Sequence, residues 1–281
     1  MAKILLSAFA DEYSSDIDIQ IKMLKEHHMN YIEPRFINGK NIAELSEREA
    51  KDLKEKLGDI RVSSIGSPLG KINLADDFQK HLEMVRRVCE TACILDTSNI
   101  RMFSFYLHQG KTRQECREEV IDKVGQMLEV ARNYEVNLCH ENEAGIYGES
   151  PECCHDLLKT FQGELKCVFD MGNFVLDGFK PYPDAYELLK PYIQYFHIKD
   201  ALHEGAIVPP GCGEGMIKEI ISQYLRDFNK DVIVTLEPHL ETFDGLNALV
   251  GKQFENPYKY ETAEAAFLDA LGKIKEIISW Q

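Results

Sequence analysis

Short apolar runs rich in β-branched residues alternate with amphipathic stretches along the whole chain. Apolar positions within the amphipathic stretches recur at helical spacing, as Leu82, Val85, Val88 and Cys89 do. The runs have the length and the bounding residues of buried strands. There are eight of them, at 3–9, 31–34, 61–65, 100–105, 136–141, 166–170, 195–199 and 232–237. The pattern therefore predicts a strand followed by a helix, repeated along the chain.

This regular alternation predicts parallel strands joined by right-handed crossovers through helices. Eight units favour a closed barrel, because an open nucleotide-binding sheet usually has fewer strands and a glycine-rich first turn. No GxGxxG follows the first run, and no GxxxxGK[ST] occurs in the chain. No linker or low-complexity segment divides the sequence, so we expect one α/β domain, a single (β/α)8 TIM barrel, over residues 1–281.

Composition narrows the class of protein and its compartment. Of 281 residues, 47 are Asp or Glu and 32 are Lys or Arg, which gives a formal charge of −15. This acidity disfavours a nucleic-acid partner, which usually selects a basic face. No apolar run approaches the roughly 18 residues of a membrane span, and the first residues lack the pattern of a signal peptide. The eight cysteines are scattered without a CxxC pair. We therefore expect reduced thiols and a cytoplasmic protein.

Four of the later strands end in residues that could bind a metal ion. These are Glu141 in LCHENE, Asp170 in VFDMGN, His197 in YFHIKD and Glu237 in VTLEPH. Active sites of barrels lie at this end of the strands, and three carboxylates with one imidazole suit Mn²⁺, Mg²⁺, Co²⁺ or Zn²⁺. The alternative is that each residue is an independent charge at an exposed strand end.

Several segments resemble the xylose isomerase-like barrel superfamily of sugar isomerases and epimerases. The resemblance lies in CVFDMGNFVLDG, PYIQYFHIKDA, PPGCGEGMI and VTLEPHL, with YIEPRFINGKNI, SSIGSPLGKI and NIRMFSFY typical of one branch labelled sugar phosphate isomerase/epimerase. The superfamily includes tagatose and psicose 3-epimerases, inosose dehydratases and, more distantly, endonuclease IV. The resemblance covers nearly the whole chain, and it is specific for the superfamily rather than for a substrate.

The resemblance implies one divalent metal ion, with Mn²⁺ as the first expectation. Its ligands would be Glu141, Asp170, His197 and Glu237. Glu141 and Glu237 would also be the catalytic acid–base pair, exchanging a proton through a metal-bound enediolate. Lys199 follows His197 by two positions, so strand alternation puts it on the same face, where it would be a catalytic cation. The alternative is a surface lysine.

Further residues are candidates for binding a small-molecule substrate. Glu33 is expected to bind a sugar hydroxyl, and an ion pair with Arg35 is the alternative. Asn173 stands where several relatives have a histidine, and its amide favours contact with substrate over metal binding. His239, two residues after Glu237, is expected to reach substrate at the mouth of the barrel. His140 should point towards the helices, although some relatives that act on oxidised glycosides use a histidine nearby.

Two segments bear on the kind of substrate. Residues 207–210 supply no ligand where the endonuclease has metal-binding residues, so a DNA-repair site is not expected. Backbone N–H groups of the glycine-rich segment 210–215 could hold a phosphate, but Glu214 within it would repel an anion. We expect an unphosphorylated sugar or keto-sugar. The irregular segment 238–257 is placed as a lid on a barrel would be.

These observations lead to the hypothesis of a metal-dependent sugar isomerase or epimerase. A lyase of the same superfamily is the alternative, acting like inosose dehydratase or a 3-keto-glycoside deglycosidase, because it needs the same metal and base. A barrel kept for sugar sensing is a third possibility, against which the intact ligand set argues. Assembly into a homo-oligomer is left open, with Trp280 as one apolar residue that could seal an interface.

Overall fold

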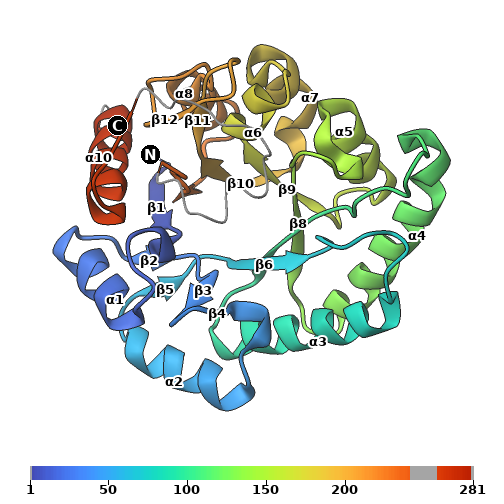
Figure 1. Cartoon of the computed structure of the whole chain (residues 1–281), viewed down its shortest axis with the longest axis horizontal. Coiled ribbons are helices and arrows are strands. Elements are labelled where there is room, and N and C mark those ends of the chain that lie inside the picture. The colour runs from blue at the N-terminus through green and yellow to red at the C-terminus, as the bar shows by residue number, and fades with distance from the viewer. Residues whose placement is uncertain (1, 241–257, 280–281) are drawn as a thin grey trace.

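A curled sheet of seven parallel strands forms the centre of the computed structural model, which describes residues 2–240 and 258–279 (Figure 1). Every neighbouring pair in this sheet is parallel. The strands lie in the order β1 (Ile4–Ala8), β13 (Val232–Leu236), β10 (Ile193–Ile198), β9 (Lys166–Asp170), β8 (Asn137–Glu141), β7 (Asn99–Met102) and β6 (Ile65–Leu69).

A separate parallel pair closes the gap between the two ends of this sheet. The pair consists of β2 (Tyr31–Ile32) and β5 (Arg61–Val62). The N–H of Glu33, just after β2, donates to the carbonyl of Ala8 in β1 at 3.0 Å. On the other side, β5 leads through two serines into β6. The predicted (β/α)8 barrel is therefore confirmed, while its extent as one domain over residues 1–281 stays a prediction.

Helices surround the strands on the outside (Figure 1). The described helices are α1 (Ile17–Glu26), α2 (Glu47–Leu57), α3 (Phe78–Ile94), α4 (Arg113–Arg132), α5 (Pro151–Thr160), α6 (Met171–Leu176), α7 (Tyr186–Leu189), α8 (Ile217–Phe228) and α10 (Ala263–Ile278). Local sequence fixes where several begin: Ser46 and Thr112 form capping boxes with Glu49 and Glu115, ahead of α2 and α4. None of the described helices is both long and apolar enough to cross a membrane.

The third predicted strand differs from the structure. The expected run 61–65 is divided into β5 and β6, and β6 continues to Leu69. Ser63 and Ser64 interrupt the ladder, and the hydroxyl of Ser63 lies 2.7 Å from that of Ser7 on β1, where both are buried. The small polar residues of SSIGSPLG are typical of a turn, which is why the pattern ended the strand too early.

Two short antiparallel hairpins stand outside the barrel sheet. One joins β3 (Phe36–Ile37) to β4 (Lys40–Asn41), and the other joins β11 (Asp200–Ala201) to β12 (Ile207–Val208). Most of the segment predicted as a lid, 238–257, lies outside the described residues, and so does Trp280.

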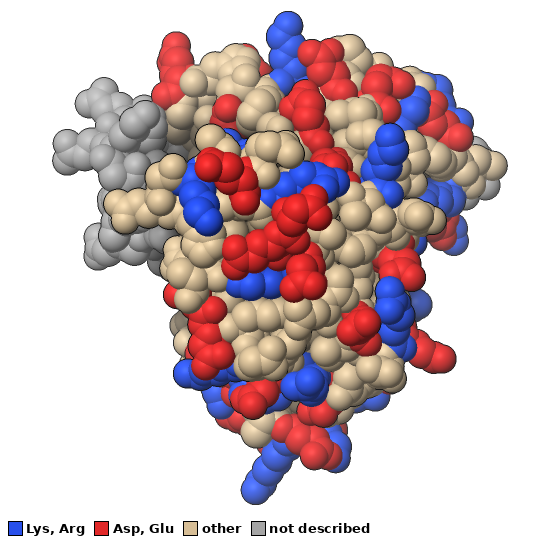
Figure 2. Space-filling view, turned by 90° about the vertical axis from the view of Figure 1, so that its right-hand side faces the viewer, with Lys and Arg blue, Asp and Glu red and all other residues tan. Residues whose placement is uncertain are grey.

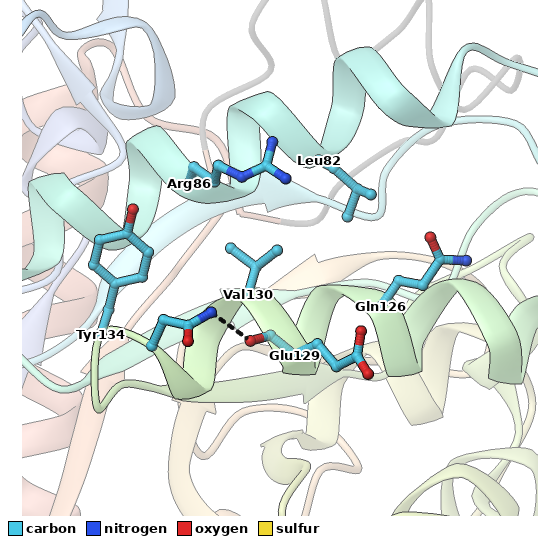
Figure 3. A pocket seen from close by; sticks show the side chains of 7 residues that line it. Leu82, Arg86, Gln126, Glu129, Val130 and Tyr134 are labelled. Carbon is cyan, nitrogen blue, oxygen red and sulfur yellow. Dashed lines mark hydrogen bonds between the residues drawn. The ribbon is translucent and has the colours of Figure 1, made fainter.

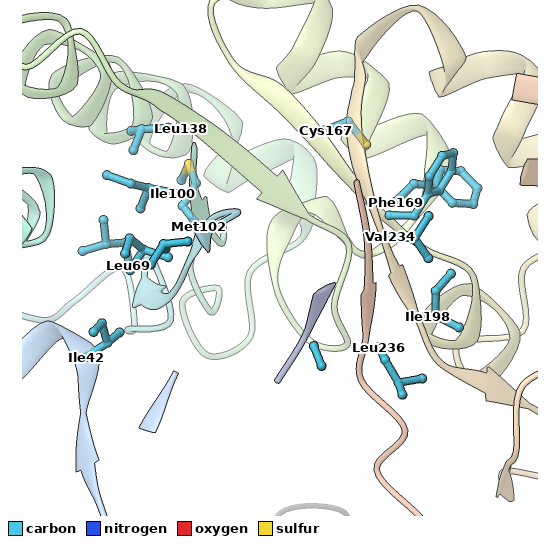
Figure 4. Close-up of a cluster of buried hydrophobic side chains, with 14 of the residues drawn as sticks. Ile42, Leu69, Ile100, Met102, Leu138, Cys167, Phe169, Ile198, Val234 and Leu236 are labelled. Carbon is cyan, nitrogen blue, oxygen red and sulfur yellow. The ribbon is translucent and has the colours of Figure 1, made fainter. Parts of the chain in front are cut away.

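Strand alternation separates an apolar layer under the helices from the interior of the barrel. Buried side chains such as Phe169, Ile198 and Val234 belong to the large apolar cluster of Figure 4. The alternate positions form a small interior cluster of Cys139, Val168 and Tyr195, packed against Ile233. Each of these interior residues is followed two positions later by a polar residue of the same face. Those residues are Glu141, Asp170, His197 and Thr235.

Charge on the surface is mixed on the face that Figure 2 shows. Acidic side chains gather near its centre, with Lys and Arg side chains around them. This face carries no broad basic area of the kind that binds a phosphate backbone. The absence of a nucleic-acid partner stays a prediction.

Candidate metal centre and active site

The carboxyl ends of four neighbouring strands bring the predicted metal-binding residues together. Glu141 ends β8, Asp170 ends β9, His197 lies in β10 and Glu237 directly follows β13. Each side chain offers one ligand atom, all four atoms lie within 4.8 Å of one another, and all four residues are buried. We call these residues the ligand group. Spacing in the sequence could not establish that these four side chains meet, but the barrel brings them together.

Distances within the ligand group fit a divalent ion. The His197 Nδ1 lies 2.8 Å from Glu141 Oε1 and 3.1 Å from Glu237 Oε2. Two adjacent ligands at ~2.1 Å from an octahedral ion are ~3.0 Å apart. Among the described residues, the buried Glu237 Oε2 makes no hydrogen bond, although Lys199 Nζ lies 3.6 Å away. A buried carboxylate oxygen without a hydrogen bond costs free energy unless a cation binds it. The residues therefore suit a metal ion.

Electrostatics around the ligand group also favour a bound cation. Within residues 2–240 and 258–279, buried carboxylates outnumber the buried cations beside them. The acids are Glu12, Glu33, Glu141, Asp170 and Glu237, and the cations are Arg101 and Lys199, with Arg35 slightly exposed. Burial raises the pKa of Asp170 against the opposing charge of Lys199, and the neighbouring carboxylates Glu141 and Glu237 raise it further. A divalent ion would relieve this excess of negative charge.

Glu33 lies beneath His197, inside the barrel. Its two oxygens are each 3.3 Å from His197 Nε2. Tyr195 donates its hydroxyl to Oε1 at 3.0 Å, and Thr235 donates to Oε2 at 2.7 Å. A carboxylate on the far nitrogen of a metal-binding histidine fixes the orientation of its ring. Glu33 therefore binds three side chains of the barrel interior and holds the ring of His197 in place. Its predicted contact with a substrate hydroxyl stays a prediction.

Lys199 is buried, so the alternative of a surface lysine is wrong. Its Nζ donates to Asp170 Oδ2 at 3.1 Å and to Asn173 Oδ1 at 3.0 Å. Burial lowers the pKa of Lys199, but the carboxylates of Asp170 and Glu237 raise it by more, so the ammonium stays charged. The structure thus places a fixed cation beside the ligand group, 3.6 Å from Glu237 Oε2.

Asn173 orients its neighbours in this structure. Its backbone N–H donates to Asp170 Oδ1 at 2.9 Å at the start of α6, and its Nδ2 donates to the carbonyl of Asn142 at 2.8 Å. Asn142 in turn exchanges two hydrogen bonds with the backbone of Asp170, at 2.9 and 3.0 Å. The sequence analysis missed Asn142, which directly follows Glu141. A substrate contact of Asn173 stays a prediction.

A buried arginine, also missed by the sequence analysis, bridges the two glutamates. Arg101 in β7 places NH1 3.2 Å from Glu141 Oε2 and 3.7 Å from Glu237 Oε1. Its guanidinium carbon lies 5.0 Å from the ring centres of both Phe9 and Phe103. A charged residue between Ile100 and Met102 in a strand is as unusual as Glu237 after VIVTL, and this pattern could have revealed it.

Arg35 forms ion pairs with Asp11, Glu12 and Glu237, and not with Glu33. Its Nε donates to Asp11 Oδ2 at 2.9 Å, NH2 to Glu12 Oε1 at 3.1 Å and NH1 to Glu237 Oε1 at 3.2 Å. The alternative of a pair with Glu33 is therefore not the arrangement found. Asp11 and Glu12 follow β1 at the same end of the barrel as the ligand group.

The mouth of the barrel is lined by further polar groups. His239 Nε2 lies 3.7 Å from Glu237 Oε1, and its side chain is 18% exposed. Its contact with a substrate stays a prediction. Lys71 pairs with Glu143 at 2.9 Å above the ring of Phe103. His140 precedes the inward-facing Glu141 in β8, so its side chain lies on the other face of the strand. There it is fully buried, with Nε2 2.9 Å from Ser104 Oγ.

The glycine-rich segment holds a carboxylate of the protein. Gly211 and Gly213 donate their N–H groups to Asp200 Oδ2 at 2.8 and 2.9 Å. Gly215 donates to Oδ1 at 2.9 Å, and a Cβ on Gly213 would lie 2.3 Å from that oxygen. The N–H groups that could have held a phosphate are therefore occupied, which supports the expectation of an unphosphorylated substrate.

A groove on the helical layer lacks this chemistry. It has a volume of about 300 Å³ and lies between α3 and α4 (Figure 3). Leu82 and Val130 meet there with Arg86, Glu129 and Tyr134. These side chains are a mixture of apolar and single charged groups, and the acid–histidine clusters found among the described residues lie elsewhere. The mouth of the barrel is therefore the candidate active site.

Comparison with solved structures finds the same barrel in enzymes and metal-binding proteins. The IolI protein with a bound zinc atom superimposes with a TM-score of 0.75 at 18% identity, over 99% of this chain and 98% of that one. D-Psicose 3-epimerase from Clostridium cellulolyticum H10, with D-tagatose, gives 0.73 at 15%, over 97% and 99%. The probable 3-DHS dehydratase AsbF from Bacillus anthracis gives 0.68 at 20%, over 95% and 98%. At these identities the likeness shows the fold.

A search of curated protein sequences gave no match. The family model described as "Xylose isomerase-like TIM barrel" matches residues 21–274, which is most of the chain. The resemblance in the strand-end segments and the barrel itself agree with this match. The chain belongs to the xylose isomerase-like TIM barrel family.

Proposed function

We propose that this protein is a divalent-metal-dependent isomerase or epimerase of an unphosphorylated sugar or keto-sugar, working by proton transfer through an enediolate. The observation that carries the proposal is the ligand group: four buried acid and histidine ligand atoms within 4.8 Å, of which Glu237 Oε2 makes no hydrogen bond to any described residue. The presence of a sugar epimerase among the similar structures supports it. We propose Mn²⁺ first, with Mg²⁺, Co²⁺ or Zn²⁺ as alternatives for this oxygen and nitrogen donor set.

Glu141, Asp170, His197 and Glu237 would hold the ion. Bound there, a divalent ion supplies Lewis acidity, which makes the proton next to a sugar carbonyl easier to remove. Glu33 serves this arrangement by keeping the ring of His197 in place through its Nε2.

Glu237 and Glu141 are the proposed acid–base pair. Each has one oxygen anchored by an arginine: Arg35 binds Glu237 Oε1 at 3.2 Å, and Arg101 binds Glu141 Oε2 at 3.2 Å. The other oxygen of each faces His197 Nδ1. With the inner oxygen of each carboxylate on the ion, the outer oxygen would remove a proton from a substrate carbon and return it, on the same face or on the opposite one.

Lys199 is the proposed electrostatic partner of the reaction. Since its ammonium stays charged among the carboxylates, it donates hydrogen bonds and does not act as a base. A negative charge that develops on a substrate oxygen would be stabilised by this cation. Asn173 holds Lys199 in place from the other side, and His239 would bind a hydroxyl at the mouth.

A lyase is the second candidate, and the position of Lys199 favours it. Elimination needs the same proton removal and then a proton donor for the departing hydroxyl or aglycone. The glutamate that removed the proton would return it to the departing oxygen, and the ammonium of Lys199, 3.6 Å from Glu237 Oε2, would donate a hydrogen bond to that oxygen. The likeness to a probable dehydratase is in keeping with this alternative. Product mass separates the two, because epimerisation conserves it and elimination does not.

The setting of the reaction completes the proposal. We propose that the protein acts in the cytoplasm on a small molecule, without nucleic acid or a membrane as partner. Whether it works alone or as a homo-oligomer is a question for size-exclusion chromatography with light scattering.

Deuterium exchange tests the proposed function directly. The protein, loaded with Mn²⁺, is incubated in D₂O with ketoses, aldoses, inososes and 3-keto-glycosides, and each sugar is followed by NMR. We expect deuterium at one carbon of one sugar, and no exchange with Glu237→Gln. Glu118→Gln, a change of a side chain that is 86% exposed, is the matched control and should exchange like the wild type. Absence of exchange across the panel, with the ion bound, would overturn the proposal.

A further inference from the structure

A second group of potential metal ligands lies next to the ligand group. Glu12, Glu237 and His239 each offer one ligand atom, and these atoms also lie within 4.8 Å of one another. Glu237 belongs to both groups. Two carboxylates and an imidazole are a donor set for Mn²⁺, Co²⁺ or Zn²⁺, so the geometry alone would allow a second ion that shares Glu237 with the first.

The guanidinium of Arg35 contacts every member of this second group. NH2 lies 3.1 Å from Glu12 Oε1, and NH1 lies 3.2 Å from Glu237 Oε1 and 3.4 Å from His239 Nε2. The Nε is taken by Asp11 at 2.9 Å, and the guanidinium carbon lies 4.5 Å from the centre of the Phe9 ring. All three guanidinium nitrogens therefore have partners, and the ring of Phe9 packs against the face of the guanidinium.

We infer that Arg35 is a built-in cation that takes the place of a second metal ion and limits this centre to one ion. A guanidinium is charged at any physiological pH and cannot dissociate from the protein. It anchors Glu237 by Oε1 alone, and Oε2, which makes no hydrogen bond within the described part of the chain, is left for the ion of the ligand group. The inference rests on the proposed function in one respect: Glu237 belongs to both groups, and the ligand group is taken to hold one metal ion.

The second group does not depend on Arg35 for its assembly. The backbone N–H of His239 donates to Glu12 Oε2 at 2.7 Å, so these two residues stay together when the guanidinium is removed. The backbone of Glu237 is fixed by the neighbouring strand β10, since its N–H donates to the carbonyl of Ile198 at 3.1 Å. The side chain of Arg35 is 14% exposed, which gives water and ions a route to the space it leaves. Removal of Arg35 is therefore expected to create a metal site.

Metal content per chain tests the inference. Five proteins are stripped with EDTA and reloaded with Mn²⁺: the wild type, Arg35→Ala, Arg35→Gln, the double variant Arg35→Ala/His239→Ala, and Arg48→Ala. Arg48→Ala is the control, because the side chain of Arg48 is 91% exposed. Free metal is removed by gel filtration, bound metal is measured by mass spectrometry, and folding is checked by circular dichroism. EPR then distinguishes isolated from spin-coupled Mn²⁺ ions. Arg35→Gln replaces Arg35→Ala if the alanine variant does not fold.

We expect Arg35→Ala to bind one ion more per chain than the wild type, with a spin-coupled EPR signal because Glu237 would bridge the two ions. The double variant and Arg48→Ala should return to the wild-type count. An unchanged count in Arg35→Ala, a wild type that already binds two ions, or an extra uncoupled ion that survives the His239 change would each overturn the inference. A wild type that binds none refutes the proposed metal centre, while the difference of one ion still supports the role of Arg35.

Discussion

Replacement of Glu237 by glutamine should abolish the stabilisation of the fold by metal while leaving the metal-free fold intact. The substitution keeps the shape of the side chain and removes its charge. Arg35 would retain Asp11 and Glu12 as partners, and Arg101 would retain Glu141. Because carboxylates already outnumber cations at this site, the loss of one negative charge also relieves repulsion. We expect the metal-free variant to stay within ~1 kcal/mol of wild type, rather than lose the ~3–5 kcal/mol typical of a broken buried pair.

The metal-loaded proteins should differ more strongly. An ion at ~100 times its dissociation constant stabilises the native state by ~2.7 kcal/mol. Changes in the residues around metal ligands cost ~10–100-fold in affinity, and a direct ligand should cost at least the upper value. A 100-fold loss therefore removes almost all of this stabilisation. At ~2 °C per kcal/mol for a chain of this size, the melting temperature of the wild type should rise by ~5 °C with Mn²⁺, and that of the variant by ~1 °C or less.

Thermal unfolding with EDTA or with Mn²⁺ measures both effects. Glu143→Gln is the matched control, since Glu143 pairs with Lys71 at the mouth and lies outside the ligand group. It should keep the full rise in melting temperature. A rise of the same size in Glu237→Gln as in the wild type would refute the assignment of Glu237 as a ligand.

Three further predictions follow from contacts elsewhere in the structure. Asp200→Ala removes the acceptor of four backbone N–H groups and should lower the free energy of unfolding in urea by ~3–5 kcal/mol; a loss below ~1 kcal/mol would contradict the role of Asp200. In Gly172→Ala the new Cβ would lie 2.7 Å from both Cγ and the carbonyl oxygen of Lys199. Because this displaces Lys199, we expect ~10–100-fold lower activity with an unchanged metal count. Gly125→Ala is the control and should behave as wild type, since its Cβ would lie 3.6 Å from the nearest atom. Burial lowers the pKa of His81 from 6.5 to about 4, so the unfolded chain takes up a proton at this residue first as the pH falls. His81 should therefore lower the free energy of unfolding of the wild type by ~3 kcal/mol between pH 6.5 and 4. Urea titrations of His81→Leu should lack this share of the pH dependence, and an equal change of the free energy of unfolding with pH in both proteins would argue against it.

The barrel and its ligand group could be predicted because they depend on local patterns. Strand alternation decides which side chains point inward, and the carboxyl ends of parallel strands meet at one end of the barrel. Asp170 and His197 therefore follow from their positions two residues after Val168 and Tyr195. Arg101 obeys the same rule and could have been found, since it is a charged residue in the middle of the apolar strand β7.

The partners of these residues could not be predicted, because they come from segments far apart in the chain. Glu33 on the second strand of the barrel meets His197 on the seventh, and Arg35 meets residues that follow the first and the last. Nothing in the local sequence tells whether a buried carboxylate will hold a sugar or a histidine. Asp200 is a similar case: the glycine segment showed that an anion could be bound, and the fold supplied that anion from a neighbouring hairpin.

The arrangement of cations around the ligand group explains how one glutamate can have two roles. A ligand that is also a base must hold the ion with one oxygen and take up the proton with the other. Arg35 and Arg101 both approach Oε1 of Glu237, while Oε2 faces the ligand group and makes no hydrogen bond to the residues that the structure describes. Glu141 shows the same division, with Oε2 bound to Arg101 and Oε1 towards His197. Permanent guanidinium charges on the outer oxygens therefore orient both carboxylates before an ion or a substrate arrives. In the proposed reaction, Lys199 and His239 would then select between epimerisation and elimination.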